Sequence, residues 1–270
     1  HHRPTLVFAE AFQVSLDDTG QPKPIDERQF TILIEQCSKA TLFNMGLIHY
    51  HWGSPDSAMQ FFDLAASLSH ANAQTPLAFD PVVLGCLNNM AQINLQYGNT
   101  NNAMEMLTDA LTRGNAALAA IYGEERPDSM QQDVARTRRL RRKLSRTVMN
   151  MAHVHFFKCD YDAAMIACND ALRLLHSNIE DTEAAAVWYN IGMLQHHKGD
   201  LTAAVKYLDM FLERVRVLMG PKDLQMAEGL HRRGMILFEM GNLYESMKPL
   251  NEALSIRRTT LGSNHAAVAE

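Results

Sequence analysis

Long apolar runs are missing from this chain of 270 residues. No stretch approaches the roughly 18 consecutive apolar residues that a membrane-spanning helix requires, which argues against an integral membrane protein. Cysteine is scarce too: four residues are scattered without a CxxC pair, so a disulfide scaffold is excluded and an intracellular, cytoplasmic setting is expected. With 20% charged and 47% hydrophobic residues, the composition predicts a folded protein of one or two domains rather than a disordered one.

Both ends of the sequence look incomplete. The segment His1-His2-Arg3-Pro4 has no initiator methionine and no signal-peptide pattern, so we interpret it as a fragment or the end of an affinity tag. Nuclear or organellar targeting therefore stays open. Residues 266–270 resemble the start of a further helix, which predicts that the natural chain continues.

Five anchor residues recur along the chain, each after a helix-like run and before a polar residue. They are 45, 61, 40 and 42 residues apart: Gly53, Gly98, Cys159, Gly199 and Gly241. With each anchor numbered position 15, position 20 holds Ala58, Ala103, Ala164, Ala204 and Ser246. Apolar residues at spacings of three and four on both sides of the anchors predict a pair of helices in each copy. The anchors suit a left-handed turn, and the polar residues that follow can cap the second helices: Ser54, Asn99, Asp160, Asp200 and Asn242.

Small residues at positions 8, 20 and 27 and large ones at positions 4, 7, 11 and 24 resemble the tetratricopeptide repeat. The segments 218–221 and 261–265 resemble the Leu-Gly-x-x-His turns of the kinesin light chain subfamily. The resemblance covers residues 38–270 and implies an all-α, right-handed superhelical solenoid of about five helix-turn-helix repeats, near 38–80, 83–123, 144–180, 184–222 and 226–262. Residues 1–37 fall outside the register and are expected to form an N-terminal extension that caps the stack.

In such a stack the first helices line a concave groove, where positions 2, 5 or 6, 9 and 13 share one stripe. Position 6 holds Asn in four of the five copies, although Asn is a mediocre helix former. The resemblance implies that these amides hold the backbone of an extended peptide. The alternative is that they bond between adjacent repeats. The predicted groove residues are Asn44, Asn89, Asn150, Asn190, Arg232, His51, His153, Tyr189, His197 and His231.

The interval of 61 residues between the second and third anchors contains a basic segment without any acidic residue. Its helical spacing predicts an Arg-rich insertion at 124–146 that extends the first helix of the third repeat backwards, with Asp128 near its start. Three interpretations remain: a solvated face balanced by acids such as Glu124, Glu125 and Asp133; a contact for an acidic peptide, membrane headgroups or RNA; or a nuclear import signal. The basic patch comprises Arg136, Arg138, Arg139, Arg141, Arg142, Lys143 and Arg146.

Motifs for catalysis, cofactor binding or metal binding are not recognisable. His49 and His51, like His153 and His155, lie two residues apart, so on a helix their rings point about 200° apart and cannot share an ion. Phosphate loops and nucleophile signatures are also missing. The predicted function is that of a non-catalytic adaptor or scaffold that binds an extended peptide of another protein. The alternatives are binding of nucleic acid or an acidic partner through the Arg-rich helix, and an architectural role in a larger complex.

Overall fold

The computed structural model describes residues 39–71, 80–123, 130–175 and 182–268, and all regular structure in these ranges is helical. Contacts divide the chain into two compact units, residues 1–119 and 120–270. The N-terminal extension at 1–37 and Asp128 lie outside the described residues.

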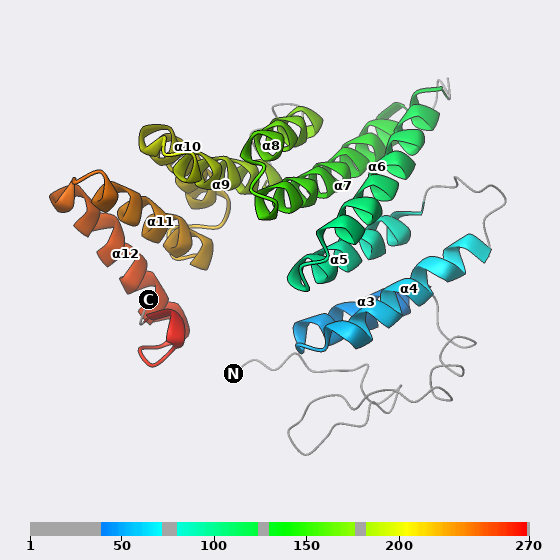
Figure 1. Cartoon of the computed structure of the whole chain (residues 1–270), viewed down its shortest axis with the longest axis horizontal. Coiled ribbons are helices and arrows are strands. Elements are labelled where there is room, and N and C mark those ends of the chain that lie inside the picture. The colour runs from blue at the N-terminus through cyan, green and yellow to red at the C-terminus, as the bar shows by residue number, and fades with distance from the viewer. Residues whose placement is uncertain (1–38, 72–79, 124–129, 176–181, 269–270) are drawn as a thin grey trace, which may run out of the picture. The chain divides into compact units, whose positions relative to one another are not determined.

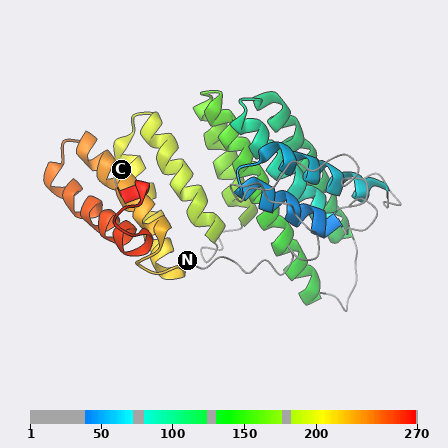
Figure 2. The ribbon, with the colours of Figure 1, turned by 90° about the horizontal axis from the view of Figure 1, so that it is seen from below.

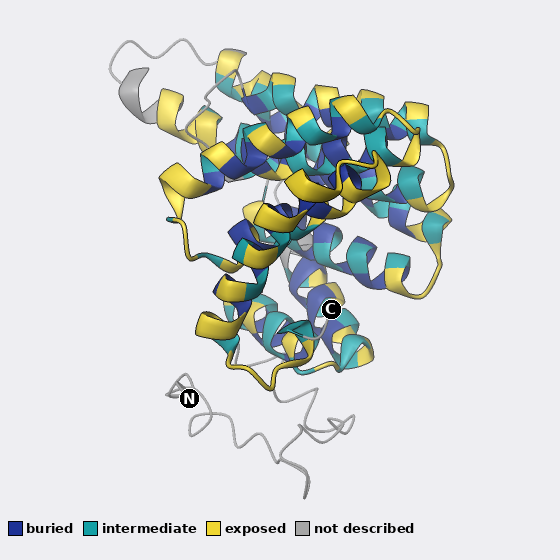
Figure 3. Cartoon of the chain, turned by 90° about the vertical axis from the view of Figure 1, so that its left-hand side faces the viewer, coloured by how far each residue is buried: buried dark blue, intermediate teal, exposed yellow. Residues whose placement is uncertain are grey.

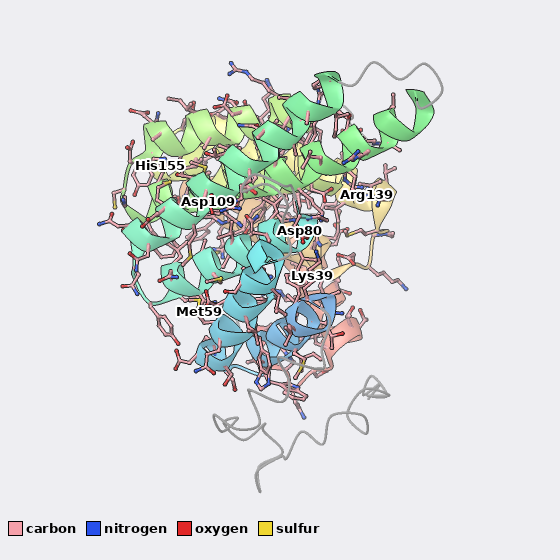
Figure 4. All side chains as sticks on the ribbon, turned by 90° about the vertical axis from the view of Figure 1, so that its right-hand side faces the viewer. Lys39, Met59, Asp80, Asp109, Arg139 and His155 are labelled. Carbon is pink, nitrogen blue, oxygen red and sulfur yellow. The ribbon has the colours of Figure 1, made fainter. Side chains whose placement is uncertain are left out.

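The first unit contains α3 (Lys39–His51), α4 (Pro55–Ala71), α5 (Pro81–Gln96) and most of α6 (Thr100–Gly123). Its core joins the fully buried rings of Phe61 and Phe62 on α4 to Leu42 on α3 and Ile93 on α5. An ion pair between Lys39 and Asp80, whose carboxylate also caps α5, links the starts of the two first helices (Figure 4). We call α3 and α4, which pack together, pair 1, and α5 and α6, which the turn at Gly98 joins, pair 2.

The second unit holds α7 (Met130–Phe157), α8 (Tyr161–Leu175), α9 (Thr182–His197), α10 (Leu201–Leu218), α11 (Leu224–Glu239), α12 (Leu243–Leu261) and the short η1 (Ala266–Val268). Neighbours in sequence pack together as pairs 3, 4 and 5, namely α7/α8, α9/α10 and α11/α12, and each of the last two pairs contacts the pair before it (Figure 1). The succession from α9 to α12 is also clear in Figure 2, where the colour runs from yellow to red. The repeated helix-turn-helix unit of an α-solenoid is thus present.

The turns within the pairs have the backbone conformation that the anchors predict. All four anchor glycines have positive φ, from 75° at Gly53 to 84° at Gly199, and Cys159 takes the same left-handed place with φ 58°. Asp160 and Asp200 accept hydrogen bonds from the backbone N–H groups of Ala163 and Ala203 and so cap their helices. The expected cap at Asn242 is wrong, because its side chain makes no capping hydrogen bond.

Small residues allow the two helices of a pair to approach closely, which buries the inward faces (Figure 3). A Cβ atom added to Gly46, at position 8 of pair 1, would lie 2.6 Å from Cε1 of Phe62. Ala58, Ala103, Ala164 and Ala204, at position 20, are fully buried. The periodic small residues are therefore packing requirements of the pair.

The basic segment and the first helix of pair 3 form one uninterrupted helix. α7 has 28 residues, whereas the other first helices have 13 to 16. At about 1.5 Å per residue α7 is about 42 Å long, compared with about 24 Å for a helix of ordinary length. α6 is long as well, with 24 residues against 15 to 19 in the other second helices. The extra length of this interval is therefore shared between the end of α6 and the start of α7, rather than added to α7 alone as expected.

Candidate functional site

The four Asn residues at position 6 lie in different environments. In the first unit Asn44 is exposed and Asn89 is half-buried on the first helices. In the second unit Asn150 is buried and Asn190 is half-buried. Of these four side chains, only that of Asn44 is exposed.

Asn190 hydrogen-bonds to His153, which is at position 9 of the preceding pair. Burial lowers the pKa of His153, while this hydrogen bond opposes the shift. His153 is thus held as a neutral imidazole whose partner is an amide on the next pair. Asn190 therefore forms a hydrogen bond between adjacent repeats, which was the alternative to peptide binding.

Tyr189, Glu228 and Arg257 form a polar network between pairs 4 and 5. The Tyr189 hydroxyl donates to Oε1 of Glu228 at 3.1 Å, and Nη2 of Arg257 donates to its Oε2 at 3.0 Å. Arg257 is 7% exposed and also donates to the carbonyl oxygen of Ala267 at 3.0 Å. Burial raises the pKa of Glu228, but interactions with Arg232, Tyr189 and Arg257 lower it by a larger amount. The net shift of the pKa is therefore downwards, and the carboxylate stays ionised.

The predicted groove residues Arg232 and His231 belong to the same network. Nε of Arg232 lies 2.9 Å from Glu228, and Nη2 of Arg257 lies 3.3 Å from Nδ1 of His231. The guanidinium groups of Arg232 and Arg257 therefore share the carboxylate of Glu228. The side chain of Arg232 is 47% exposed and remains accessible.

Position 13, where the sequence places His51 and His197, contacts position 12 of the preceding pair. The ring of His197 packs edge-on against Phe156, with centroids 4.8 Å apart. At the equivalent places, Gln96 donates to the hydroxyl of Tyr50 at 2.8 Å, and His196 lies 2.7 Å from Glu239. We call this recurring contact the 12–13 contact. His51 lies on the first pair and is exposed.

A second contact joins position 18 of one pair to position 14 of the next. The Tyr97 hydroxyl donates to Asp56 at 2.8 Å, and Nζ of Lys198 lies 2.6 Å from Asp162. The Lys198 ammonium lowers the pKa of the Asp162 carboxyl through its hydrogen bond and its charge. We call this the 18–14 contact. Together the two contacts fix the register of adjacent pairs.

The basic patch divides into a bound part and an accessible part. Glu183 on α9 takes ion pairs from Arg142 at 2.8 Å and Arg146 at 3.4 Å. Arg141 donates to the hydroxyl of Tyr122, and its guanidinium carbon lies 5.8 Å from the centre of that ring. The remaining arginines are exposed on α7 and make no ion pair within the described ranges: Arg136, Arg138 and Arg139. Figure 4 labels Arg139 on this helix. Lys143 is half-buried.

Several important polar residues were not found from the sequence. Glu228 is at position 2, on the predicted groove stripe, so its location in the repeat could have identified it as a groove residue. Glu183 and Arg257 carried no such signal, because their roles depend on contacts 37 to 41 and 26 to 29 residues away in sequence. The acids expected to balance the basic patch, Glu124, Glu125 and Asp133, have side chains outside the described residues.

Comparison with known proteins supports the fold derived above. Residues 183–259 match the family model described as tetratricopeptide repeat. This segment spans helices α9 to α12, which are two of the helix pairs described above. No curated protein matches the sequence of this chain.

Solved structures share the fold of this chain at low sequence identity. A kinesin light chain of Podospora anserina with nearly identical repeats has a TM-score of 0.58 and 12% identity, over 82% of this chain and 95% of that one. BtubC from P. vanneervenii has a TM-score of 0.61 and 16% identity, over 88% and 84%. The apo form of RapI has a TM-score of 0.60 and 15% identity, over 82% and 71%. Tetratricopeptide-repeat proteins are generally non-catalytic scaffolds for other proteins. No helix in the described part of the chain is long and apolar enough to cross a membrane.

Proposed function

We propose that the chain is a non-catalytic adaptor that binds an extended segment of another protein along the first helices of pairs 1 and 2. The exposed amide of Asn44, next in the same stripe to the half-buried amide of Asn89, carries this proposal. An amide offers both a donor and an acceptor, so it can pair with the peptide backbone whatever the neighbouring side chains are. An intracellular, cytoplasmic setting fits the four scattered cysteines, which form no CxxC pair in the sequence.

Apolar and polar side chains beside these amides supply the surface for a ligand. Phe43 packs over Gly85, where an added Cβ would lie 2.9 Å from the ring, and Leu47 and Gln92 are half-buried. Each amide contributes only about 0.5–1.5 kcal/mol net, so affinity depends on several amides and apolar contacts acting together.

A matched pair of variants tests this proposal. Peptides would be selected on the whole chain from a random library, and their affinity measured by fluorescence polarisation for the wild type and for Asn44→Ala/Asn89→Ala. We expect binding to weaken about tenfold while the melting temperature is unchanged. Asn102→Ala, an exposed Asn on the second helix α6, is the control and should bind normally. Unchanged binding by the double variant, or its unfolding, would contradict the proposal.

A second candidate function is binding of an acidic partner by α7. It is favoured by the three exposed arginines that have no carboxylate partner within the described ranges: Arg136, Arg138 and Arg139. Binding of a single-stranded RNA or of a poly-glutamate peptide would be measured at two salt concentrations, with the triple replacement by Gln. If this function is correct, affinity falls steeply with salt and is lost in the triple variant. Binding of the RNA but not of the poly-glutamate peptide would indicate that the partner is a nucleic acid. Equal binding by the wild type and the triple variant would show that these arginines of α7 are not the binding surface.

A further inference from the structure

A cleft of about 640 Å³ lies between the second helices of pairs 4 and 5. Its two walls come from α10 and α12, and residues of α11 form its floor. Because a complete helix pair stands on either side, the cleft belongs to a junction inside the stack. Ligand sites in proteins commonly have a volume of this size. We call it the 10–12 cleft.

Pair 5 departs from the repeat at two positions beside this cleft. Position 7 holds Arg233, in place of the apolar residues of the earlier pairs, Met45, Met90, Met151 and Ile191. The Arg233 side chain turns to α10, where its Nε lies 2.6 Å from Oδ1 of Asp209. Position 23 holds Pro249, whereas the earlier pairs have Phe61, Met106, Ala167 and Tyr207. Pair 5 therefore lacks a large apolar side chain at both positions, which leaves the space between α10 and α12 open.

The inner part of the 10–12 cleft is apolar. Leu212 on α10 and the α11 residues Met226 and Leu230 are buried and line it, together with the buried ring of Pro249. An aliphatic chain entering the cleft would therefore leave water for an apolar surface, as the stems of lysine and arginine side chains do in many interfaces.

Charged residues surround this apolar part, with four acids against three bases. Two ion pairs use part of the set: Arg233 with Asp209 at 2.6 Å and Arg216 with Glu252 at 3.9 Å. The charged groups of the lining that make no ion pair in the described part of the chain are Glu213, Glu245 and Lys248. Two carboxylates and one ammonium thus remain, and the cleft as a whole has a net charge of about −1.

Pro249 supplies a further acceptor. It stands inside α12 and has no N–H group, so the carbonyl oxygen of Glu245, four residues earlier, lacks its usual helical donor. The Glu245 carboxylate lines the same wall, and Glu213 lines the opposite wall on α10. Oxygen acceptors on both walls of the cleft favour a ligand group that carries several N–H donors and a positive charge.

We propose that the 10–12 cleft binds an arginine side chain that projects from a partner protein. The stem packs on Leu212, Met226 and Leu230, and the guanidinium group bonds to the carboxylates of Glu213 and Glu245. Arginine fits better than lysine, because its planar fork has five donors and can serve both walls at once. The ring of Tyr244, 93% exposed at the rim, offers a further surface for the cation. The cleft lies on the second helices, so this inference stands apart from the proposed peptide function of the first helices.

Methyl NMR of the whole chain tests the proposal, because Met226 lies in the floor of the cleft. In protein labelled with ¹³C at the methionine methyl groups, the Met226 signal is the one that disappears in Met226→Leu. The probe is the peptide acetyl-Ala-Ala-Arg-Ala-Ala-amide. Its control contains citrulline, which has nearly the same shape as arginine but no charge. We expect the arginine peptide to shift the Met226 signal saturably with a Kd of about 1 mM, and the citrulline peptide to bind at least about tenfold more weakly.

Three variants examine the charges. Glu213→Gln/Glu245→Gln should weaken binding of the arginine peptide about tenfold and leave the melting temperature nearly unchanged, since both acids are exposed. Lys248→Gln removes a competing cation and should strengthen binding severalfold. Glu105→Gln, which changes an exposed acid on α6, is the matched control and should bind as the wild type does.

The proposal would be overturned by an unmoved Met226 signal at about 20 mM arginine peptide. Equal binding of the arginine and citrulline peptides, or unchanged binding by the double variant, would also reject it. Self-association of the chain, seen by sedimentation, would reject the partner protein if it were lost both in Glu213→Gln/Glu245→Gln and in the triple variant of α7. The arginine in the cleft would then come from a second copy.

Discussion

The hydroxyl of Tyr189 on α9 donates a 3.1 Å hydrogen bond to Glu228 on α11, and so joins two first helices 39 residues apart in sequence. Arg257, from the second helix α12, donates to the same carboxylate. One acid therefore connects both helices of the last pair to the pair before it, and positions 5 and 2 of adjacent pairs meet at this point. Phe43 over Gly85 makes the equivalent contact in the first unit with an aromatic ring and no polar group.

Glu228→Ala should destabilise the protein strongly, because it removes a carboxylate to which the buried guanidinium of Arg257 donates. Removing one member of a buried pair costs about 3–5 kcal/mol, and the 39% exposure of the Glu228 side chain reduces this to about 2–3 kcal/mol. Urea unfolding followed by circular dichroism measures the change. Glu245→Ala, an exposed acid on α12, is the control. A loss below about 0.5 kcal/mol for Glu228→Ala would mean that the network does not stabilise the last pair.

Asn190→Ala should cost about 1 kcal/mol, since it removes the hydrogen bond that joins pair 4 to His153 of pair 3. Asn44→Ala should cost almost nothing, because the Asn44 side chain is exposed. The comparison of the two free energies of unfolding tests whether position 6 has a structural role in the second unit. Coupling in a double-mutant cycle with His153→Ala would locate the effect, and strict additivity of the two changes would contradict it.

Gly46→Ala should destabilise pair 1 although alanine is the better helix former. The gain in helix propensity is about 0.5–1 kcal/mol, but the new Cβ would lie 2.6 Å from the buried ring of Phe62, and such overpacking costs about 1–3 kcal/mol. We expect a net loss of about 1 kcal/mol. Gly192→Ala is the comparison, because its Cβ would approach nothing closer than 3.3 Å. In the Gly46→Ala background, Phe62→Leu should cost less than in the wild type.

Acid should destabilise the first unit through His49, which is 3% exposed and stacks on Phe61 with ring centres 5.0 Å apart. Burial lowers the pKa of His49 below its ordinary value of 6.5. The unfolded chain therefore binds a proton at higher pH than the folded chain does, so stability is complete above about pH 6.5 and falls as the pH drops below it.

His49→Phe should flatten this dependence, because a phenyl ring fills the same apolar site without titrating. Thermal unfolding from pH 8 to pH 5 measures it: the melting temperature of the wild type should fall by several degrees more than that of the variant. Parallel curves for the two proteins would exclude His49 as the source. The two proteins should melt within a few degrees of each other at pH 8.

The repeat register could be obtained from the sequence because it depends on local chemistry. Left-handed turns at Gly53 and Cys159 follow from residues next to each other along the chain, and the small residues at position 20 follow from the period. The helix that carries the basic patch was predicted for the same reason, from unbroken apolar spacing. The expected cap at Asn242 failed because a favourable residue type does not ensure that the side chain adopts the bonded geometry.

The partners of polar side chains could not be obtained in this way. Position 6 looks uniform as a row of Asn residues, yet Asn44 is exposed while Asn190 bonds to His153. The basic patch likewise looks continuous, but Glu183 takes up Arg142 and Arg146 and leaves the earlier turns of α7 accessible. The different environments of the Asn residues and of the arginines arise from side chains on a neighbouring pair. Those side chains are too far away in sequence for a local pattern to reveal the contact.

The sequence by itself therefore determined the helix pairs, their turns and their small residues, because each of these depends on backbone conformation and on spacing within about 40 residues. The tertiary structure alone decided which amides are open and which arginines are paired. Those properties belong to contacts between pairs, where a side chain's environment is set by the neighbouring pair. The basic patch is the clearest case, since Glu183 on α9 pairs with Arg142 and Arg146 while Arg139, on the same helix as those arginines, is exposed.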